Sequence, residues 1–237
     1  MRLIPGYLAM FLTTAAVSAL AGVTPQPGDL TTLQATGNGN EYAACITLVA
    51  NLDLRQITAA DNGWLNTNAF RTGEGLSTPT SNTAARNDVP LGAVIAFVPA
   101  LVDNNAADGF LGAPSSGIAF STTGDQIFIF RGTSAAPTLL CGLTSYRRTW
   151  QSNATDSNTS ALPPGAAHYA AVGQAPDHHT DVYFSMTTPP SDSFNLKAAR
   201  LNPANWTGNQ SPALRFADRS FSTILLTSNV PDFSIFE

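Results

Sequence analysis

The sequence predicts an all-β protein built as one domain, and three features support this prediction. In residues 126–131 (QIFIFR), Ile127 and Ile129 point to one side of an extended strand and Phe128 and Phe130 to the other. Both sides are apolar, which is typical of a strand covered on each face inside a packed β structure. The chain also has 18 Gly and 16 Pro but only 11% charged residues, as expected for short strands joined by turns. Its length of 237 residues suits a single sandwich or barrel.

Other strands are predicted where short apolar runs lie between turn-forming residues. These runs are residues 42–49, 54–58, 92–98, 138–144, 181–186 and 222–227. Within 138–144 (TLLCGLT), strict alternation would place Leu139, Cys141 and Leu143 on one apolar face.

Polar segments between the strands predict long loops. In residues 61–75 (DNGWLNTNAFRTGEG), Asn62 and Gly63 favour a tight reversal with positive φ. Trp64 is expected to fold back from this reversal as a hydrophobic plug. Residues 147–164 form a second polar loop.

One short helical piece is expected near the C-terminus, at residues 193–201. Ser191 or Asp192 would be its N-cap, because a side-chain oxygen at that position accepts a hydrogen bond from the first turn. The turn 202–206 (NPANW) follows.

Residues 1–21 are predicted to be an export signal. Arg2 supplies a positive start, an apolar run follows, and residues 19–21 (ALA) form a small-residue cleavage site. An uncleaved membrane anchor is the alternative, although the apolar run is short for a helix that spans a bilayer. We therefore expect an N-terminal tail at 22–40 and a β-sandwich domain at 41–237, secreted or held at the cell surface.

The charge distribution argues against two classes of partner. The net charge is −5, and the arginines are scattered except for Arg147 and Arg148, so no basic stripe could neutralise a phosphate backbone. Nucleic acid is therefore not expected as a partner. No apolar segment after the export signal is long enough to predict a membrane span.

Cys45 and Cys141 are the two cysteines of the chain. Export would permit a disulfide between them, and closing so long a loop would restrict the unfolded chain by roughly 4 to 5 kcal/mol. We expect this disulfide to form. Two free, buried thiols on separate strands are the alternative.

Four residues are candidates for a metal site, although no cofactor is expected. Asp61 and Glu74, together with loop carbonyls, offer oxygen ligands for Ca²⁺, which takes roughly six to eight of them. His178 and His179 are adjacent, and adjacent side chains on a strand point to opposite faces, so both reach one ion only from a loop. His168 is the one further histidine.

No catalytic residues are predicted. A Ser/His/Asp triad would need a nucleophile context such as G-x-S-x-G, and the sequence has none. Asp61 and Glu74 could form the carboxylate pair of a glycoside hydrolase, but an ion pair of either one with Arg71 is the simpler expectation. Three tryptophans are either sugar-stacking platforms or core residues: Trp64, Trp150 and Trp206.

Four asparagines lie in Asn-x-Ser/Thr patterns and are candidates for N-glycosylation: Asn153, Asn158, Asn205 and Asn209. In a eukaryotic host the first two, on a polar loop, are the better acceptors. Such patterns also arise by chance in a chain rich in Asn, Ser and Thr.

After an early apolar strand, the chain carries in order DNGW, AFRTGEG, GAVIAF, STTGDQIFIF with RGT, PTLL and LNPANWTG. This ordered set, over residues 41–210, resembles a group of exported, mostly bacterial proteins with lamin-tail-like β-sandwich domains. The resemblance implies an immunoglobulin-like sandwich outside the cell, with no catalytic residues to carry over. One segment departs from the pattern, because LSTPTSNT stands where the relatives continue as an apolar, Trp-bearing strand.

These features predict a secreted, non-enzymatic interaction module of the cell surface or extracellular matrix, whose partner is an extracellular protein or glycan. One alternative is a carbohydrate-binding module that uses a loop Trp and calcium. The other is a secreted hydrolase that works from the loop of His178 and His179.

Overall fold

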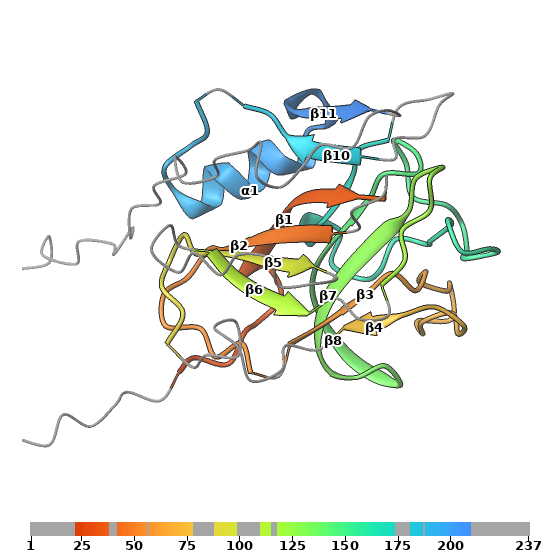
Figure 1. Ribbon diagram of the computed structural model, residues 1–237, viewed down its shortest axis with the longest axis horizontal. Helices are drawn as coiled ribbons and strands as arrows, with labels where there is room; N and C mark the ends of the chain where they lie inside the picture. Colours follow the sequence, from red (N-terminus) through yellow and green to blue (C-terminus); the bar gives the residue numbers. More distant parts are fainter. Residues whose placement is uncertain are drawn as a thin grey trace, which may run out of the picture.

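The computed structural model describes residues 22–37, 42–55, 57–77, 88–98, 110–114, 118–173, 181–186 and 188–209. Within these ranges the chain forms eleven strands in two sheets, with one short α-helix beside them (Figure 1). The prediction of an all-β fold is confirmed.

The first sheet has six strands in the order β11-β10-β1-β2-β5-β6. Its strands are β1 (Leu30–Thr36), β2 (Tyr42–Thr47), β5 (Val94–Val98), β6 (Phe110–Pro114), β10 (Asp181–Phe184) and β11 (Trp206–Asn209). All neighbours are antiparallel except β5 and β6, which run parallel.

The second sheet has five strands in the order β4-β3-β7-β8-β9. Its strands are β3 (Ile57–Ala60), β4 (Leu76–Ser77), β7 (Gln126–Thr133), β8 (Ala136–Thr144) and β9 (Tyr169–Ala171). Only β8 and β9 are parallel. The predicted central strand is therefore β7, the third of five.

The two faces of β7 pack into two separate apolar clusters. Ile127 and Ile129 face the main core, which both sheets share and which also contains Ile46 and Ile95 of the six-stranded sheet. On the opposite face, Phe128 belongs to a second, mainly aromatic cluster. The members of this cluster are Ala60, Trp64, Phe70, Phe128, Phe130, Leu139, Ala161 and Tyr169, with the half-buried Trp150 packed against them. The apolar character of both faces follows from this double burial, at about 1.5 to 3 kcal/mol for each large side chain.

A β-bulge in β8 changes the predicted alternation. Ile129 pairs with Cys141 and Phe130 with Leu139, so Leu140 is the extra residue on β8. Leu140 consequently joins Cys141 in the main core, whereas Leu139 lies in the aromatic cluster. The expectation that Leu139, Cys141 and Leu143 share one face is wrong for Leu139, because a one-residue insertion reverses the faces beyond it.

The stretch 22–40, expected to be an N-terminal tail, contains β1. This strand lies third in the six-stranded sheet, between β10 and β2, and all seven of its residues are buried. Its sequence, LTTLQAT, is half polar, which explains why no apolar run revealed it. The position is decided by long-range pairing with β2 and β10.

Helix α1 (Ser193–Leu201) has the bounds that the sequence predicts. The side chain of Asp192 is its N-cap and accepts a hydrogen bond from the N–H of Asn195 at 2.8 Å. The helix covers one end of the six-stranded sheet (Figure 1), and its residue Leu196 is fully buried. The turn predicted at 202–206 is a 3-10 helix (Pro203–Asn205) that leads into β11.

Both cysteines are free and fully buried in the main core, Cys45 on β2 and Cys141 on β8. The expected disulfide is not formed, and the alternative of two buried thiols on separate strands describes the structure. Burial raises the pKa of both thiols, that of Cys141 to about 12.

Several predictions fall outside the described residues. These are the export signal at 1–21, the strand at 222–227, and His178 with His179. In the part of the chain that the structure describes, no helix has the length and apolar content to cross a bilayer.

Candidate functional site

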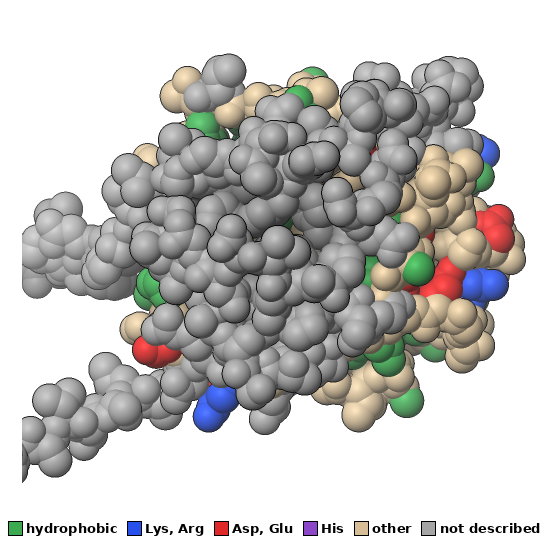
Figure 2. Space-filling model, in the orientation of Figure 1, with side chains coloured by type: hydrophobic (Ala, Val, Ile, Leu, Met, Phe, Trp, Pro, Cys, Tyr) green, Lys and Arg blue, Asp and Glu red, His purple; other side chains and the backbone are tan. Residues whose placement is uncertain are grey.

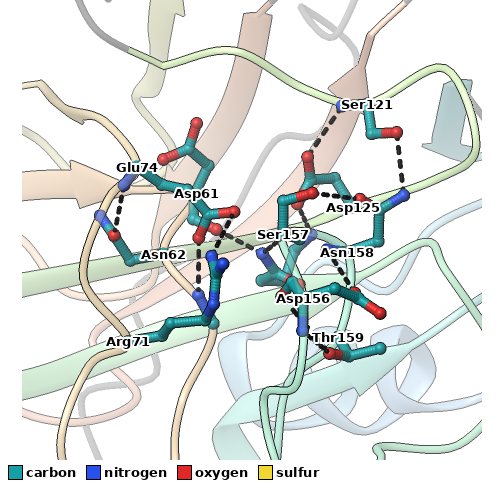
Figure 3. Close-up of polar contacts among 12 residues, drawn as sticks. Asp61, Asn62, Arg71, Glu74, Ser121, Asp125, Asp156, Ser157, Asn158 and Thr159 are labelled. Atoms are coloured by element: carbon teal, nitrogen blue, oxygen red, sulfur yellow. Dashed lines mark hydrogen bonds and ion pairs between the residues drawn. The ribbon is translucent and has the colours of Figure 1, made fainter.

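Three loops meet at the end of the five-stranded sheet where β3 ends and β7 begins. They are residues 61–75, 118–125 and 150–160, and together we call them the loop end (Figure 3). Each of the first two brings acidic side chains inward, and the third closes over them through amides and hydroxyls.

Asp61 directly follows β3 and is only 2% exposed. Its Oδ2 accepts a hydrogen bond from the backbone N–H of Ala119 at 2.7 Å, which ties the first loop to the second. Its Oδ1 is buried and has no hydrogen-bond partner. One carboxylate oxygen therefore anchors a loop, while the other is buried with no donor in hydrogen-bonding geometry.

Glu74 closes the first loop on itself. Its Oε2 accepts from the N–H of Gly63 at 3.3 Å, and its Oε1 lies 3.2 Å from the guanidinium of Arg71. Asn62 completes the closure, because its side chain accepts from the N–H of Glu74 at 3.1 Å and donates to the carbonyl of Gly75 at 2.9 Å. The ion pair with Arg71 that the sequence predicts is confirmed, with Glu74 as the acid.

The reversal expected at Asn62 and Gly63 is not found, because neither residue has a positive φ. The loop turns later, where Asn68 has φ 62° and Gly73 has φ 103°. Gly63 is required for a different reason, since a Cβ there would lie 2.3 Å from the carbonyl oxygen of Thr159. Trp64 is buried as a plug, as predicted, with its ring edge-on to Phe70 at 5.1 Å between centroids.

Asp125 holds the second loop at the start of β7. Its Oδ2 accepts from the N–H of Ser121 at 2.8 Å and its Oδ1 from the N–H of Gln126 at 2.8 Å. Its backbone N–H donates to the hydroxyl of Ser145, and its carbonyl accepts from the N–H of Ser145 at 2.7 Å. Asp125 is 5% exposed, and its carboxyl group fixes the turn before the central strand.

The third loop is joined to the other two by side-chain amides. Gln126 donates from Nε2 to the carbonyl of Asp61 and, at 2.8 Å, to the carbonyl of Ser157. Asn158 donates from Nδ2 to the hydroxyls of Ser121, at 2.8 Å, and Thr123. Because Gln126 comes from the central strand, the loop contacts are continuous with the sheet.

The three carboxyl groups of Asp61, Glu74 and Asp125 interact with one another electrostatically. Burial raises the pKa of Glu74 to about 7, the charge of Arg71 opposes this, and the charge of Asp61 adds to it. Burial likewise raises the pKa of Asp61, and the backbone N–H groups of Ala119, Asp61 and Gly75 oppose the rise. The pKa of Asp125 is raised well above its usual range, first by burial and further by the charges of Asp61 and Glu74. Burial therefore opposes ionisation of all three carboxyl groups, whereas their hydrogen bonds and the charge of Arg71 favour it.

In this arrangement the carboxyl groups hold the loops to one another. The oxygens that hold the loops are bonded to backbone N–H groups, and no group of three or more acidic, histidine or cysteine side chains in the described ranges could hold a metal ion. Two hollows of the surface lie elsewhere. One of about 80 Å³ is lined by Thr24, Pro25, Asp53, Ile57 and Arg131, and one of about 290 Å³ by Ser185, Met186, Thr188, Ala204 and Asn205.

The sequence candidates are distributed as follows. Asp61 and Glu74 come together, while His178 and His179 lie outside the described residues. His168 belongs to the 3-10 helix Ala166–His168, away from the loop end. The three indoles pack against other side chains of the protein. Trp64 and Trp206 are buried, and Trp150 stacks on Phe128 with 5.7 Å between the ring centroids.

The glycosylation candidates differ in their surroundings. The side-chain amide of Asn158 is bonded to two hydroxyls, and that of Asn205 donates to the carbonyl of Ala199 at 2.8 Å. Asn153 uses only its Oδ1, which accepts from the N–H of Asn66 at 3.0 Å, so a glycan on its Nδ2 breaks none of these contacts. The side chain of Asn209 is outside the described residues.

Sequence reasoning did not single out Asp125 or Gln126 as site residues, and it identified Asn158 only as a glycosylation candidate. Asp125 and Gln126 looked like the polar edge of a strand. A buried position for Asp125 could have been suspected, because it stands directly before a strand whose two faces are both apolar.

The outer surface of the loop end is mainly polar, and the charged side chains of Arg71, Glu74 and Asp156 lie among its neutral groups. Its exposed side chains are mainly hydroxyls and amides, contributed by Asn66, Thr67, Asn68, Thr72, Thr122, Thr123, Ser152, Thr155 and Ser157. Figure 2 shows this end as tan with red and blue patches of charged side chains, on the side where Figure 1 places the β3–β4 loop. Such a surface can exchange hydrogen bonds with a ligand.

No protein-family model matches the chain, and no curated protein or solved structure matches it.

Proposed function

We propose that this protein is an exported, non-enzymatic interaction module with an immunoglobulin-like, lamin-tail-like sandwich, and that the loop end is its binding surface. The observation that carries the proposal is the locked geometry of that end. Three loops from separate parts of the chain are joined by side-chain hydrogen bonds to one another and to β7. A surface held in this way loses little conformational entropy when it binds a partner.

The chemistry of the surface supports an extracellular protein or glycan as the partner. Its exposed hydroxyl and amide groups donate and accept hydrogen bonds, and the charges of Arg71, Glu74 and Asp156 lie near them. Nucleic acid would require a basic surface instead. Since the three indoles are packed in the protein, a glycan would be recognised here through hydrogen bonds and not by stacking on tryptophan.

Export is supported by the sequence at 1–21 and by the resemblance to exported sandwich proteins over residues 41–210. The ordered motifs of that resemblance supply much of the loop end, including DNGW, AFRTGEG and GDQ. Placing function on loops that a rigid sheet supports agrees with the general behaviour of such folds.

The test is binding of the purified, fluorescently labelled protein to intact cells and isolated matrix of the source organism, measured as a saturation curve. Two loop-end variants, Thr67→Arg and Thr72→Arg, put a bulky charge on exposed positions. The matched control is Ala135→Arg, at the exposed β7–β8 turn on the opposite end of the sheet. We expect saturable binding that both loop-end variants weaken at least about tenfold, because each hot-spot disruption costs about 1.4 kcal/mol or more. Absence of saturable binding, or equal loss in the control, contradicts the proposal.

A further inference from the structure

The loop end contains buried acceptor oxygens that lack a donor. Oδ1 of Asp61 and Oε1 of Gln126 are both buried without a hydrogen-bond partner, in residues that are 2% and 1% exposed. The two residues are already joined, because Nε2 of Gln126 donates to the carbonyl of Asp61. Leaving a buried acceptor unpaired costs about 1 to 3 kcal/mol.

In the same region, acidic side chains outnumber basic ones. Asp61, Glu74 and Asp125 act on one another electrostatically, and Arg71 is the cation whose charge acts on Glu74. The third loop adds Asp156, an exposed carboxylate that accepts from the N–H of Asn158 at 3.0 Å, and the end of β8 adds the neutral hydroxyls of Thr144 and Ser145. Three buried or half-buried acids thus face one cation.

A proton would supply both a hydrogen-bond donor and a positive charge. It turns a carboxylate oxygen from an acceptor into a donor, and it removes the repulsion between neighbouring acids. A hard cation is the other chemical solution, but in the described ranges the acidic side chains form no group of three that could hold one. The geometry therefore favours the proton.

We infer that the loop end is a pH-dependent lock, which is closed while at least one of Asp61, Glu74 and Asp125 carries a proton and loosens when all three ionise. This deepens the proposed function by naming a regulation of the same surface. An acidic exterior would hold the binding loops in one arrangement, and a neutral or alkaline exterior would release them.

The direction follows from the carboxyl groups themselves. Burial raises the pKa of Glu74 from its ordinary 4.5 to about 7, and raises those of Asp61 and Asp125 as well. A carboxyl whose pKa is higher in the closed state contributes stability that is fully present below its pKa in the open state. That stability is lost as the pH rises through its pKa in the closed state. For Glu74, this stability is lost between pH 4.5 and about pH 7.

The test measures amide hydrogen exchange by NMR in the full-length protein without any partner. Three reporter amides donate to the carboxyl groups: Gly63 to Glu74, Ala119 to Asp61, and Ser121 to Asp125. After correction for intrinsic exchange, we expect their protection to fall about tenfold between pH 5 and pH 8. This fall is smaller than the full pKa shift of Glu74 would give, because Glu74 is partly exposed and solvent screens its charge. The reference amide is Leu52, which donates to the carbonyl of Val89 at 3.0 Å and reports on the sandwich.

Two matched variants test whether Glu74 causes this pH dependence. Glu74→Gln, which is neutral at every pH, should reduce the pH dependence at Gly63, whereas Asp53→Asn, in an exposed pair with Arg55, should leave it unchanged. Equal protection at both pH values in the unmodified protein, or an undiminished pH effect in both Glu74→Gln and Asp61→Asn, overturns the inference. If calcium chloride restores protection at pH 8 and a chelator removes it, a cation and not a proton closes the lock. These readouts need no ligand, so they stand or fall independently of the cell-binding test.

Discussion

The guanidinium of Arg200 lies over the indole of Trp206, 4.7 Å from the ring centroid, in the layer between α1 and the six-stranded sheet. The contact is reciprocal, because Nε1 of Trp206 donates to the carbonyl of Arg200 at 2.9 Å. Arg200 also donates to the hydroxyls of Thr31 and Thr32 on β1, and its Nε is buried without a partner. Burial lowers its pKa to about 9. An aromatic face and two hydroxyls therefore surround this buried cation where an ion pair is more usual.

This arrangement predicts different outcomes for two substitutions of Arg200. Arg200→Ala should lower the free energy of unfolding by about 3 kcal/mol, because it leaves a cavity and unpaired hydroxyls beneath α1. Arg200→Met should cost clearly less, since it fills the space and removes the cost of burying a charge. Chemical denaturation of the two variants measures the difference. If Arg200→Met is as destabilising as Arg200→Ala, the charge itself is needed.

The two cysteines predict a simple chemical result. With both thiols fully buried and the pKa of Cys141 raised to about 12, Ellman's reagent should not react with the folded protein at pH 8. After unfolding without a reductant, it should titrate two thiols per chain. A count near zero would show that Cys45 and Cys141 are joined by the disulfide that the sequence led us to expect.

Gly142 lies directly opposite Phe128 across β7 and β8. A Cβ at position 142 would stand 2.6 Å from the Phe128 ring and 3.0 Å from the carbonyl oxygen of Ile127. Gly142→Ala should therefore destabilise the protein by about 1 to 3 kcal/mol through overpacking. In a double-mutant cycle measured by thermal unfolding, Phe128→Leu should offset part of that loss. Strictly additive effects would mean that the ring does not cause the clash.

The bonds of Asn158 predict how the loop end responds to modification. Asn158→Ala removes two contacts to the second loop and should lower stability by about 1 kcal/mol, detected as faster exchange at Ser121. Asn153→Gln is the control, because that side chain makes a single contact through its Oδ1.

The same difference can be measured with glycans. After expression in a eukaryotic secretory host, a glycan on Asn153 should leave the melting temperature nearly unchanged. One on Asn158 should lower it, because the sugar replaces an amide hydrogen that bonds to Ser121 or Thr123. Equal melting temperatures for the two glycoforms would contradict the assigned contacts.

The strand at residues 126–131, the helix at 193–201 and the plug at Trp64 could be predicted because each depends on local sequence. Alternating apolar residues specify a strand buried on both faces, and Asp192 stands where an N-cap must stand. The pairing of Glu74 with Arg71 was also accessible, since the two are three residues apart.

Other features depend on partners that are distant along the chain. Strand β1 has a half-polar sequence and becomes a core strand only because β2 and β10 pair with it. The bulge at Leu140 arises from the pairing of β8 with β7. Asp125 became a site residue only when folding placed it beside Asp61, which precedes it by 64 positions.

By itself, the sequence determined that this chain folds as strands, because periodicity and capping act between near neighbours. The tertiary structure decided which faces meet, which acids share one buried region and which asparagine remains available at the surface. Those outcomes depend on desolvation and on contacts between segments that no local pattern encodes.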